Sequence, residues 1–239
     1  MEEEIEIHGN LPREAPGDSG STRKAFSLLK GLPNNYRILD VGCGPGAAAL
    51  DLAEVGDGHI TAVDISQSFL DELQKRAAAK GVTQSITTTR QSMFEMDFPS
   101  QSFDIVWSEG AIYIMGFENG LRNWKRFLKE NGYLVLTELS WLTTPSSEPK
   151  AFWDRHYLGM QTVEQNLAML AQCGYETEAH FVLPESSWWN EYYGPWEEKL
   201  RLLKEKRANN PEAIQVINGG LEEIELYRKF HTEYGYVFY

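Results

Sequence analysis

The stretch Ile38-Leu39-Asp40-Val41-Gly42-Cys43-Gly44-Pro45-Gly46 is the most informative part of this chain. It is a short apolar run that ends in three glycines at alternate positions, and an alanine-rich amphipathic segment, 47–55, follows it. An apolar run bounded by glycines is typical of a buried strand, and the segment after it is typical of a helix. Glycine lets the backbone turn tightly and approach a ligand without a clashing Cβ. The stretch therefore predicts a wound α/β domain with a ligand at its first strand-to-helix turn.

The spacing of the glycines indicates which ligand this turn holds. A dinucleotide fold needs Gly-x-Gly-x-x-Gly, so that a pyrophosphate can lie on a helix N-terminus. Here the pattern is Gly-x-Gly-x-Gly, and Asp40 lies two residues before Gly42. A carboxylate at this position would repel phosphates and attract a cation. An NAD-dependent oxidoreductase stays an alternative, although the chain also lacks a Tyr-x-x-x-Lys pair.

The sequence Asp-Val-Gly-Cys-Gly-Pro-Gly at 40–46 resembles the first motif of class I S-adenosylmethionine-dependent methyltransferases, in particular the small-molecule, ubiquinone- and menaquinone-biosynthesis-like family. The resemblance covers 22–183 and the last strand. It implies that Asp40 helps to hold the ammonium group of S-adenosylmethionine, and that S-adenosylhomocysteine is the product. The loop residues expected to wrap the amino-acid end of this cofactor are Gly42, Cys43, Gly44 and Gly46.

Length and composition limit the remaining classes. With 239 residues and 42% hydrophobic residues, the chain is expected to form one domain, 1–239, with a sizeable core. The formal net charge of −13 leaves no basic footprint for nucleic acid. No apolar run approaches the ~20 residues that a membrane span needs. Two cysteines, one of them in the glycine turn, fit a reducing compartment. We therefore expect a cytoplasmic protein without a membrane span or a nucleic-acid partner.

Strand and helix patterns alternate along the chain, which favours parallel βαβ units. The predicted strands are 37–42, 59–64, 84–90, 103–108, 132–140, 175–183 and 234–239. The predicted helices are 22–32, capped by Ser19 or Ser21, and 46–55, 66–80, 117–130 and 162–173. The resemblance implies that the last strand is antiparallel and lies between the fifth and sixth. The predicted fold is a doubly wound, Rossmann-like, seven-stranded sheet, mostly parallel, with a helical insertion before its last strand.

Two segments flank this core. Residues 1–21 form a polar arm or lid, and 185–232 form the helical insertion. An aromatic cluster at 188–196 opens the insertion, and we favour packing as its role. It would pack the insertion onto the sheet or onto a second subunit of a homodimer. The alternative is the edge of a lid over a hydrophobic or cationic methyl acceptor, since aromatic faces attract methylated cations.

The next two strands carry the remaining candidates for cofactor binding. Asp64 ends the second strand, about 20 residues after the glycine loop, where an acid can accept hydrogen bonds from a ribose. A NAD site would use the same acid. Ile65 is expected to pack on the adenine face. After the third strand, the family often has an acid that meets the adenine amino group; Ser92 takes its place here, and Met93 is expected to lie against the ring.

The segment 97–107 is the second strong match to the family, and the resemblance implies a structural role for Asp104. Ligands of open α/β sheets bind beyond the carboxyl ends of the strands. Ser108 is therefore expected at the cofactor, and Glu109 and Tyr113 are the candidate catalytic residues. Glu109 would bind a cationic acceptor or act as a base, or else serve as a helix cap or ion-pair partner. Many relatives have a histidine pair near Tyr113, and this chain has none.

In similar proteins an N-terminal arm reaches over the cofactor's carboxylate, which makes Thr22 and Arg23 candidates here. A metal site is not expected, because the five histidines are scattered without ligand spacing. The predicted function is methyl transfer from S-adenosylmethionine to a small-molecule acceptor by in-line displacement. Catalysis would come mainly from positioning. A protein that holds the cofactor and transfers nothing is the second alternative, beside the NAD-dependent oxidoreductase.

Overall fold

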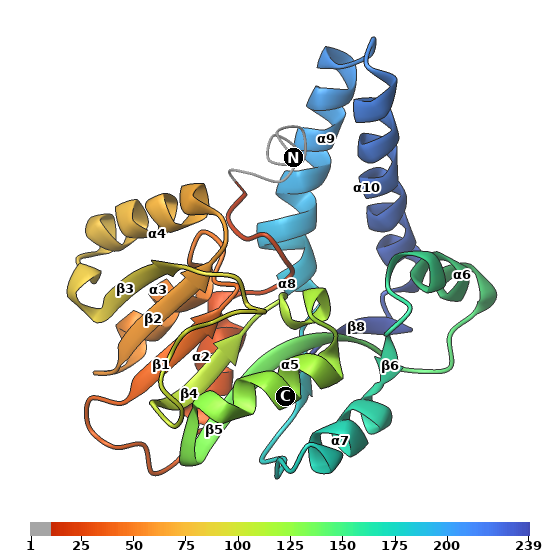
Figure 1. Cartoon of the computed structure of the whole chain (residues 1–239). Coiled ribbons are helices and arrows are strands. Elements are labelled where there is room, and N and C mark those ends of the chain that lie inside the picture. Colours follow the sequence, from red (N-terminus) through yellow and green to blue (C-terminus); the bar gives the residue numbers. More distant parts are fainter. Residues whose placement is uncertain (1–10) are drawn as a thin grey trace.

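A computed structural model describes residues 11–239, in which eight strands form one twisted sheet (Figure 1). The strand order is β3-β2-β1-β4-β5-β8-β7, and the short β6 pairs beside β5. The strands are β1 Arg37–Val41, β2 His59–Asp64, β3 Ile86–Arg90, β4 Phe103–Ser108, β5 Leu128–Trp141, β6 Gln161–Thr162, β7 Phe181–Val182 and β8 Tyr234–Phe238.

Helices cover both faces of the sheet, and two of them project from it as a long hairpin (Figure 1). The helices are α2 Ser19–Ser27, α3 Ala47–Val55, α4 Gln67–Lys80, α5 Phe117–Trp124, α6 Ser147–His156, α7 Val163–Gln172, α8 Ser186–Trp188, α9 Gly194–Lys206 and α10 Pro211–Phe230. The short turns are η1 Thr83–Ser85, η2 Ile112–Ile114, η3 Lys125–Phe127 and the π-helical η4 Trp189–Tyr193. None of the helices within 11–239 combines the length and apolar character needed to cross a membrane.

The direction of the strands confirms the predicted fold class. β1 pairs in parallel with both β2 and β4, and β8 runs antiparallel between β5 and β7. The chain winds outward from β1 to β3 and then returns to start β4 on the other side of β1. This reversal leaves a crevice beyond the carboxyl ends of β1 and β4, which is where ligands bind in open α/β sheets.

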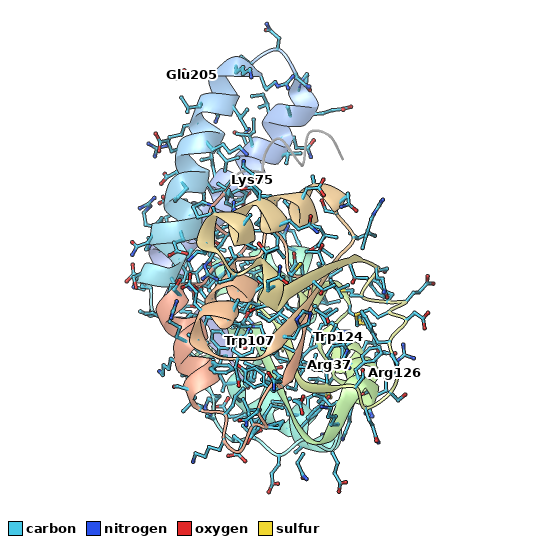
Figure 2. All side chains as sticks on the ribbon, turned by 90° about the vertical axis from the view of Figure 1, so that its left-hand side faces the viewer. Arg37, Lys75, Trp107, Trp124, Arg126 and Glu205 are labelled. Carbon is cyan, nitrogen blue, oxygen red and sulfur yellow. The ribbon has the colours of Figure 1, made fainter. Side chains whose placement is uncertain are left out.

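The sheet buries a separate hydrophobic cluster on each face because its central strands are apolar on both sides. Trp107 of β4 belongs to the cluster that α3 and α4 cover. Trp124 of α5 belongs to the other cluster, beside Leu121 and Phe127. Figure 2 shows both tryptophans in the body of the domain and Glu205 near the tip of the α9–α10 hairpin. The hairpin root packs on the first cluster through Trp196 and through α10.

Several predicted bounds are wrong, and each error has a local cause. The helix predicted over 117–130 gives way to a 3-10 turn after Trp124, because Leu128 is already extended as the first residue of β5 and pairs with Phe103 of β4. The strand predicted at 175–183 shrinks to β7, which pairs with only two residues of β8. Residues 147–156, predicted as neither helix nor strand, form α6. The helix predicted over 162–173 starts at Val163, because Thr162 pairs with β5 as part of β6.

The first described helix, α2, also starts and ends earlier than predicted. Asp18, not Ser19 or Ser21, is its N-cap: the Asp18 carboxylate accepts a hydrogen bond from the backbone N–H of Ser21 at 2.8 Å. Asp is as good a cap as Ser because its carboxylate accepts from the free N–H groups of the first turn. The helix ends at Ser27 instead of continuing to residue 32.

The aromatic cluster at 188–196 packs inside the protein. Trp188 is 1% exposed, and its ring stacks on Tyr227 of α10 with 4.0 Å between centroids. Tyr192 stacks on Trp196 at 5.4 Å, and both are buried. The π-helical turn η4 widens the helix here. The contacts favour the packing interpretation, because these rings join the hairpin to the sheet.

Candidate functional site

The glycine loop between β1 and α3 is held by backbone hydrogen bonds. The N–H groups of Gly42 and Cys43 both donate to the carbonyl of Val63 in β2, at 2.9 and 3.0 Å. Gly42 and Gly46 have φ angles of 70° and 88°, which favour glycine. The loop is thus fixed at the crevice between β1 and β4.

The three glycines of the loop serve different purposes. A Cβ on Gly42 would lie 2.5 Å from Cβ of Ala111, and one on Gly46 would lie 2.1 Å from Cδ1 of Leu73. Both glycines are therefore required by packing within the protein. A Cβ on Gly44 would meet only the Cγ of Glu14, at 3.9 Å. The backbone at Gly44 is the part of the loop that a ligand can approach.

Asp40 lies beneath the loop with one carboxylate oxygen unused. The residue is 1% exposed, and its Oδ2 has no hydrogen-bond partner. Burial raises the pKa of Asp40 well above its ordinary value, and the charges of Glu109 and Asp64 raise it further. A buried acceptor without a donor is costly. A cationic ligand in the crevice would supply both a donor and the missing charge, so this position fits an ammonium group.

Asp64 at the end of β2 braces the loop. Its Oδ2 accepts from the backbone N–H of Gly44 at 2.9 Å, and its Oδ1 accepts from the N–H of Ser66 at 2.8 Å. Each carboxylate oxygen has a second lone pair, so the group can still accept hydrogen bonds from a ribose. Ile65 beside it is 66% exposed, which leaves an apolar face bare at the edge of the crevice.

The residues after β3 also border the loop. Met93 is half-buried, and its Cε comes within 3.4 Å of the point where a Cβ on Gly42 would lie. The hydroxyl of Ser92 accepts from the N–H of Phe94 at 3.3 Å. That bond leaves its proton free to donate. Met93 thus borders the glycine loop, and Ser92 precedes it in the chain.

The N-terminal arm crosses the loop and is anchored by a buried guanidinium. The side chain of Arg13 is 6% exposed and pairs with Asp51 of α3 at 2.9 Å. It also pairs with Glu109 at 3.4 Å and with Glu191 of the insertion at 2.7 Å. The backbone N–H of Gly17 donates to the carbonyl of Ser187 at 3.1 Å. The arm therefore links the loop side of the domain to the insertion. Residues 1–10 of the predicted arm lie outside the described residues.

The arm leaves a small cavity over the loop. Its volume is 80 Å³, and the lining includes Arg13, Glu14, Asp40, Gly44 and Glu109. Pockets for small ligands usually measure ~300–1,000 Å³. One oxygen of Glu14 is buried without a partner, and burial raises the pKa of this carboxyl to about 7. A ligand of nucleoside size can enter only when the arm shifts.

Glu109, one of the two predicted catalytic residues, is committed to contacts within the protein. Its Oε1 accepts from the hydroxyl of Thr22 and from Nε1 of Trp107, both at 2.9 Å. Its Oε2 faces Arg13. Burial raises the pKa of Glu109, and the charge of Arg13 lowers it. These contacts favour the ion-pair alternative over a role as a base.

The other residues expected near the cofactor also have partners in the protein. Thr22 is buried in α2 against Glu109, and Arg23 pairs with Glu54 on the surface at 2.6 Å. Ser108 is fully buried and donates to the carbonyl of Val41 at 2.9 Å, which joins β4 to β1 at the crevice. Asp104 accepts from the backbone N–H of Arg37 at 2.8 Å, as a structural residue does.

Tyr113 leads to a pair of residues that the sequence did not reveal. Its ring is 45% exposed and meets the ring of Tyr157 edge to face, with 6.0 Å between centroids. The hydroxyl of Tyr157 donates to Oε1 of Glu138 at 2.5 Å. Glu138 lies in β5, where it is 1% exposed. The available signal was a glutamate that closely follows the apolar run 133–136 of this strand.

Two other features of the described chain carry no comparable chemistry. A groove of 880 Å³ lies at the opposite end of the sheet, around the start of β5. Its lysines are already occupied: Lys125 donates to the carbonyls of Cys173 and Gly174, and Lys129 pairs with Asp104. Within 11–239, no group of three or more His, Cys, Asp or Glu side chains is arranged to hold a metal ion.

Comparison with known proteins agrees with this geometry. Residues 38–132 match the family model described as a methyltransferase domain. A solved S-adenosylmethionine-dependent methyltransferase from Geobacter sulfurreducens, in complex with S-adenosylhomocysteine, superposes with a TM-score of 0.83 and 19% identity over 100% of this chain and 96% of its own. Residues 38–132 thus resemble a methyltransferase domain, and the superposition confirms the predicted class I methyltransferase fold.

The chain also matches parts of longer curated relatives. A sterol 24-C-methyltransferase from Neurospora crassa is 25% identical over 73% of this chain and 48% of its own. A 27-O-demethylrifamycin SV methyltransferase from Amycolatopsis mediterranei is 27% identical over 58% of this chain and 53% of its own. The chain spans about half the length of these two relatives.

Proposed function

We propose that this protein transfers a methyl group from S-adenosylmethionine to a small-molecule acceptor. The observation that carries the proposal is the unpartnered oxygen of Asp40, buried under a glycine loop at the crevice between β1 and β4. A cationic amino-acid end of a ligand fits this position, whereas the phosphates of a dinucleotide do not. The matched methyltransferase domain begins in β1 and includes this loop.

The residues present fit the cofactor without rearrangement of the sheet. Asp40 would accept from the ammonium group, and the open backbone at Gly44 would lie along the amino-acid end. Asp64 has lone pairs left for the ribose hydroxyls. Ile65 and Met93 offer apolar and thioether surface to the adenine ring. Ser92, Cys43, Gly42 and Gly46 complete the lining. Ser108 and Thr22 would act indirectly, since both are bonded within the protein.

When bound, the cofactor supplies a methyl group on a sulfonium, which is already activated toward a nucleophile. The chain then has to bind, orient and exclude water, and most of the rate can come from this positioning. The arm is suited to exclude water, because it is tied to α3 and to the insertion through Arg13. Tyr113 stands after β4, and we keep it as the candidate that contacts the acceptor. Glu109 anchors the arm.

Several properties support a small acceptor. The net charge of −13 does not favour nucleic acid, and the compared relatives are named for sterol and rifamycin methylation. Both cysteines are buried free thiols, which supports a reducing, cytoplasmic location. The insertion shares one hydrophobic cluster with the sheet, which supports a single domain over 1–239. A homodimer stays a prediction.

Isothermal calorimetry with S-adenosylhomocysteine tests the proposal. We expect saturable binding, and no binding at millimolar ligand would refute the proposed cofactor. A titration with NADH, followed by its fluorescence, should show no binding. Binding of NADH would instead favour the NAD-dependent oxidoreductase. Radiolabelled S-adenosylmethionine offered with a metabolite pool should yield a labelled product. A protein that only holds the cofactor would bind it and leave no labelled product.

A further inference from the structure

Glu138 is a buried carboxylate without a cationic partner. It lies in β5 two residues beyond Leu136, which is paired with the last residue of β4, so it stands near the carboxyl edge of the sheet. Its Oε1 accepts from Tyr157, and its Oε2 is buried with no partner. No lysine or arginine within the described residues forms an ion pair with it. The ionised form of a buried carboxyl group is unstable unless a ligand balances its charge and donates a hydrogen bond to it.

Tyrosine rings surround this carboxylate from three other elements. Tyr157 follows α6, Tyr113 lies in η2 and Tyr236 lies in β8. After burial, the charge of Glu138 is among the causes that raise the pKa of each of these tyrosines. The half-exposed ring of Tyr113 meets the ring of Tyr157, which in turn donates to Glu138. The rings form an aromatic wall beside an acidic group, which is the chemistry that recognises organic cations.

The insertion adds a second carboxylate from above. Glu223 of α10 accepts from the hydroxyl of Tyr193 at 2.8 Å, and its charge also raises the pKa of Tyr113 and of Tyr236. Tyr192 of η4 is buried beside them, and its pKa is raised by Glu223, Tyr113 and the arm residue Glu14 as well as by burial. A series of acidic and aromatic side chains therefore extends from Glu14 of the arm to Glu138.

We propose that Glu138, held by Tyr157, binds the methyl acceptor as an ammonium ion and takes its proton, so that the acceptor is an amine. This inference rests on the proposed function. Among uncharged acceptors, a hydroxyl could donate one hydrogen bond to Oε2 but would not stabilise the ionised form of this carboxyl group. A protonated amine does both, and its alkyl group can lie against Tyr113 and Tyr236.

The proposed step balances. One N–H bond of the ammonium breaks, its proton passes to Oε2 of Glu138, and the electron pair stays on nitrogen as a lone pair. That lone pair forms the new bond to the methyl carbon, while the carbon–sulfur bond breaks and leaves its pair on sulfur. The sulfonium becomes a thioether, and the product is a methylated ammonium. Glu138 later returns its proton to solvent.

Burial raises the pKa of Glu138 to about 8, against an ordinary value near 4.5. At pH 7 the free protein should therefore hold a proton on this group. An ammonium ion favours the carboxylate, so binding should expel close to one proton. The other titratable groups around Glu138 are Tyr157, Tyr113, Tyr236, Tyr239 and Glu223. The pKa of each tyrosine is raised above its ordinary value, so these four hydroxyls are uncharged near pH 7, and burial also raises the pKa of Glu223.

The test is calorimetry with hexylamine as the probe and hexanol as its neutral counterpart, on protein saturated with S-adenosylhomocysteine. Titrations in two buffers of different ionisation enthalpy give the number of protons released. We expect hexylamine to bind with release of close to one proton at pH 7, and hexanol to bind at least tenfold more weakly. Equal affinity for the two probes, or hexylamine binding without proton release, would overturn the inference.

Two variants and a control locate the effect. Glu138→Gln keeps the shape but not the charge, and it should weaken hexylamine binding ~30-fold or more and abolish proton release. Tyr157→Phe should weaken it less. Glu130→Gln, an exposed change at the other end of β5, should alter neither. Hexylamine affinity that survives Glu138→Gln contradicts the inference.

The binding of S-adenosylhomocysteine separates the two levels of the proposal. If it binds to wild type and to Glu138→Gln, the variant is folded and the amine result applies to the acceptor alone. If the variant fails to fold, the wild-type comparison of hexylamine with hexanol and the proton count still decide the inference. If S-adenosylhomocysteine does not bind to wild type, the proposed function fails, whatever hexylamine does with the free protein.

Discussion

Replacing Arg13 with methionine removes a buried cation that holds the arm to the domain while keeping much of its apolar stem. In the wild type, the guanidinium contacts Asp51, Glu109 and Glu191 at 2.9, 3.4 and 2.7 Å. We expect the variant to lose ~3 kcal/mol of its free energy of unfolding, because removing one partner of a buried ion pair leaves uncompensated buried charge.

The expected loss of stability depends on the partners that each of the three carboxylates keeps after Arg13 is replaced. Glu191 is 39% exposed and can regain water, so it adds little. Asp51 and Glu109 are only 7% and 9% exposed and cannot. Asp51 keeps a hydrogen bond from Ser19 at 2.8 Å, and Glu109 keeps its two donors. These remaining bonds place the expected cost at the lower end of the ~3–5 kcal/mol typical of broken buried pairs.

Urea unfolding followed by tryptophan fluorescence measures this loss, and its pH dependence adds a second test. Without Arg13, the pKa of Glu109 in the folded state should rise further above its unfolded value, since the charge of Arg13 lowers it now. The folded variant then binds more protons than the unfolded chain, so its stability falls as pH rises. The difference from wild type should therefore be smaller at pH 5 than at pH 8.

Arg23→Met is the matched control, because Arg23 is 41% exposed, pairs with Glu54 at 2.6 Å and reaches the buried Asp51 only at 3.9 Å. That change should cost no more than ~1 kcal/mol. The interpretation of Arg13 as a buried anchor is refuted if the two variants lose equal stability, or if the loss for Arg13→Met is the same at pH 5 and pH 8.

Four further outcomes are expected. Asp64→Ala should weaken S-adenosylhomocysteine binding by roughly 1.5–3 kcal/mol in calorimetry, and unchanged affinity would remove Asp64 from the site. Gly46→Ala should cost roughly 2 kcal/mol more than Gly81→Ala in urea unfolding: both glycines have positive φ, but only Gly46 faces a side chain, at 2.1 Å. Trp188→Ala should cost ~3–5 kcal/mol, and a loss below 1 kcal/mol would contradict its packing role. Glu14→Gln should gain stability relative to wild type as pH rises from ~4.5 to 7, because burial raises the pKa of Glu14 in the folded state to about 7 and folding disfavours its negative charge. Parallel curves of unfolding free energy against pH for the two proteins would show that Glu14 titrates normally.

The parts of the fold set by local signals were predictable from the sequence. The strand of Ile38 to Val41, the glycine turn and the helix after it follow from residues that lie next to one another. The strand that ends at Asp64 was predicted with its full bounds for the same reason. In contrast, β7 is short because β8 offers it only two partners, and no local pattern reports that.

The site shows the same division. The glycines and Asp64 are recognised by their spacing, and the structure places them together at one crevice. The pairing of Arg13 with Glu109 joins residues 96 positions apart, and that of Tyr157 with Glu138 depends on where the turn after α6 returns to the sheet. Contacts of this kind are set by tertiary packing, so the sequence alone could not assign Glu109 to the arm or find Glu138.

The arm that crosses the glycine loop also has a consequence for measured affinities. The cavity over the loop measures 80 Å³ with the arm in place, so we expect that only molecules with a displaced arm bind the ligand. The apparent dissociation constant is then the intrinsic one divided by the competent fraction. If roughly one molecule in a hundred is open, the observed affinity is ~100-fold weaker than the open site would give. A change that loosens the arm should thus lower the free energy of unfolding and, at the same time, increase the affinity for the ligand.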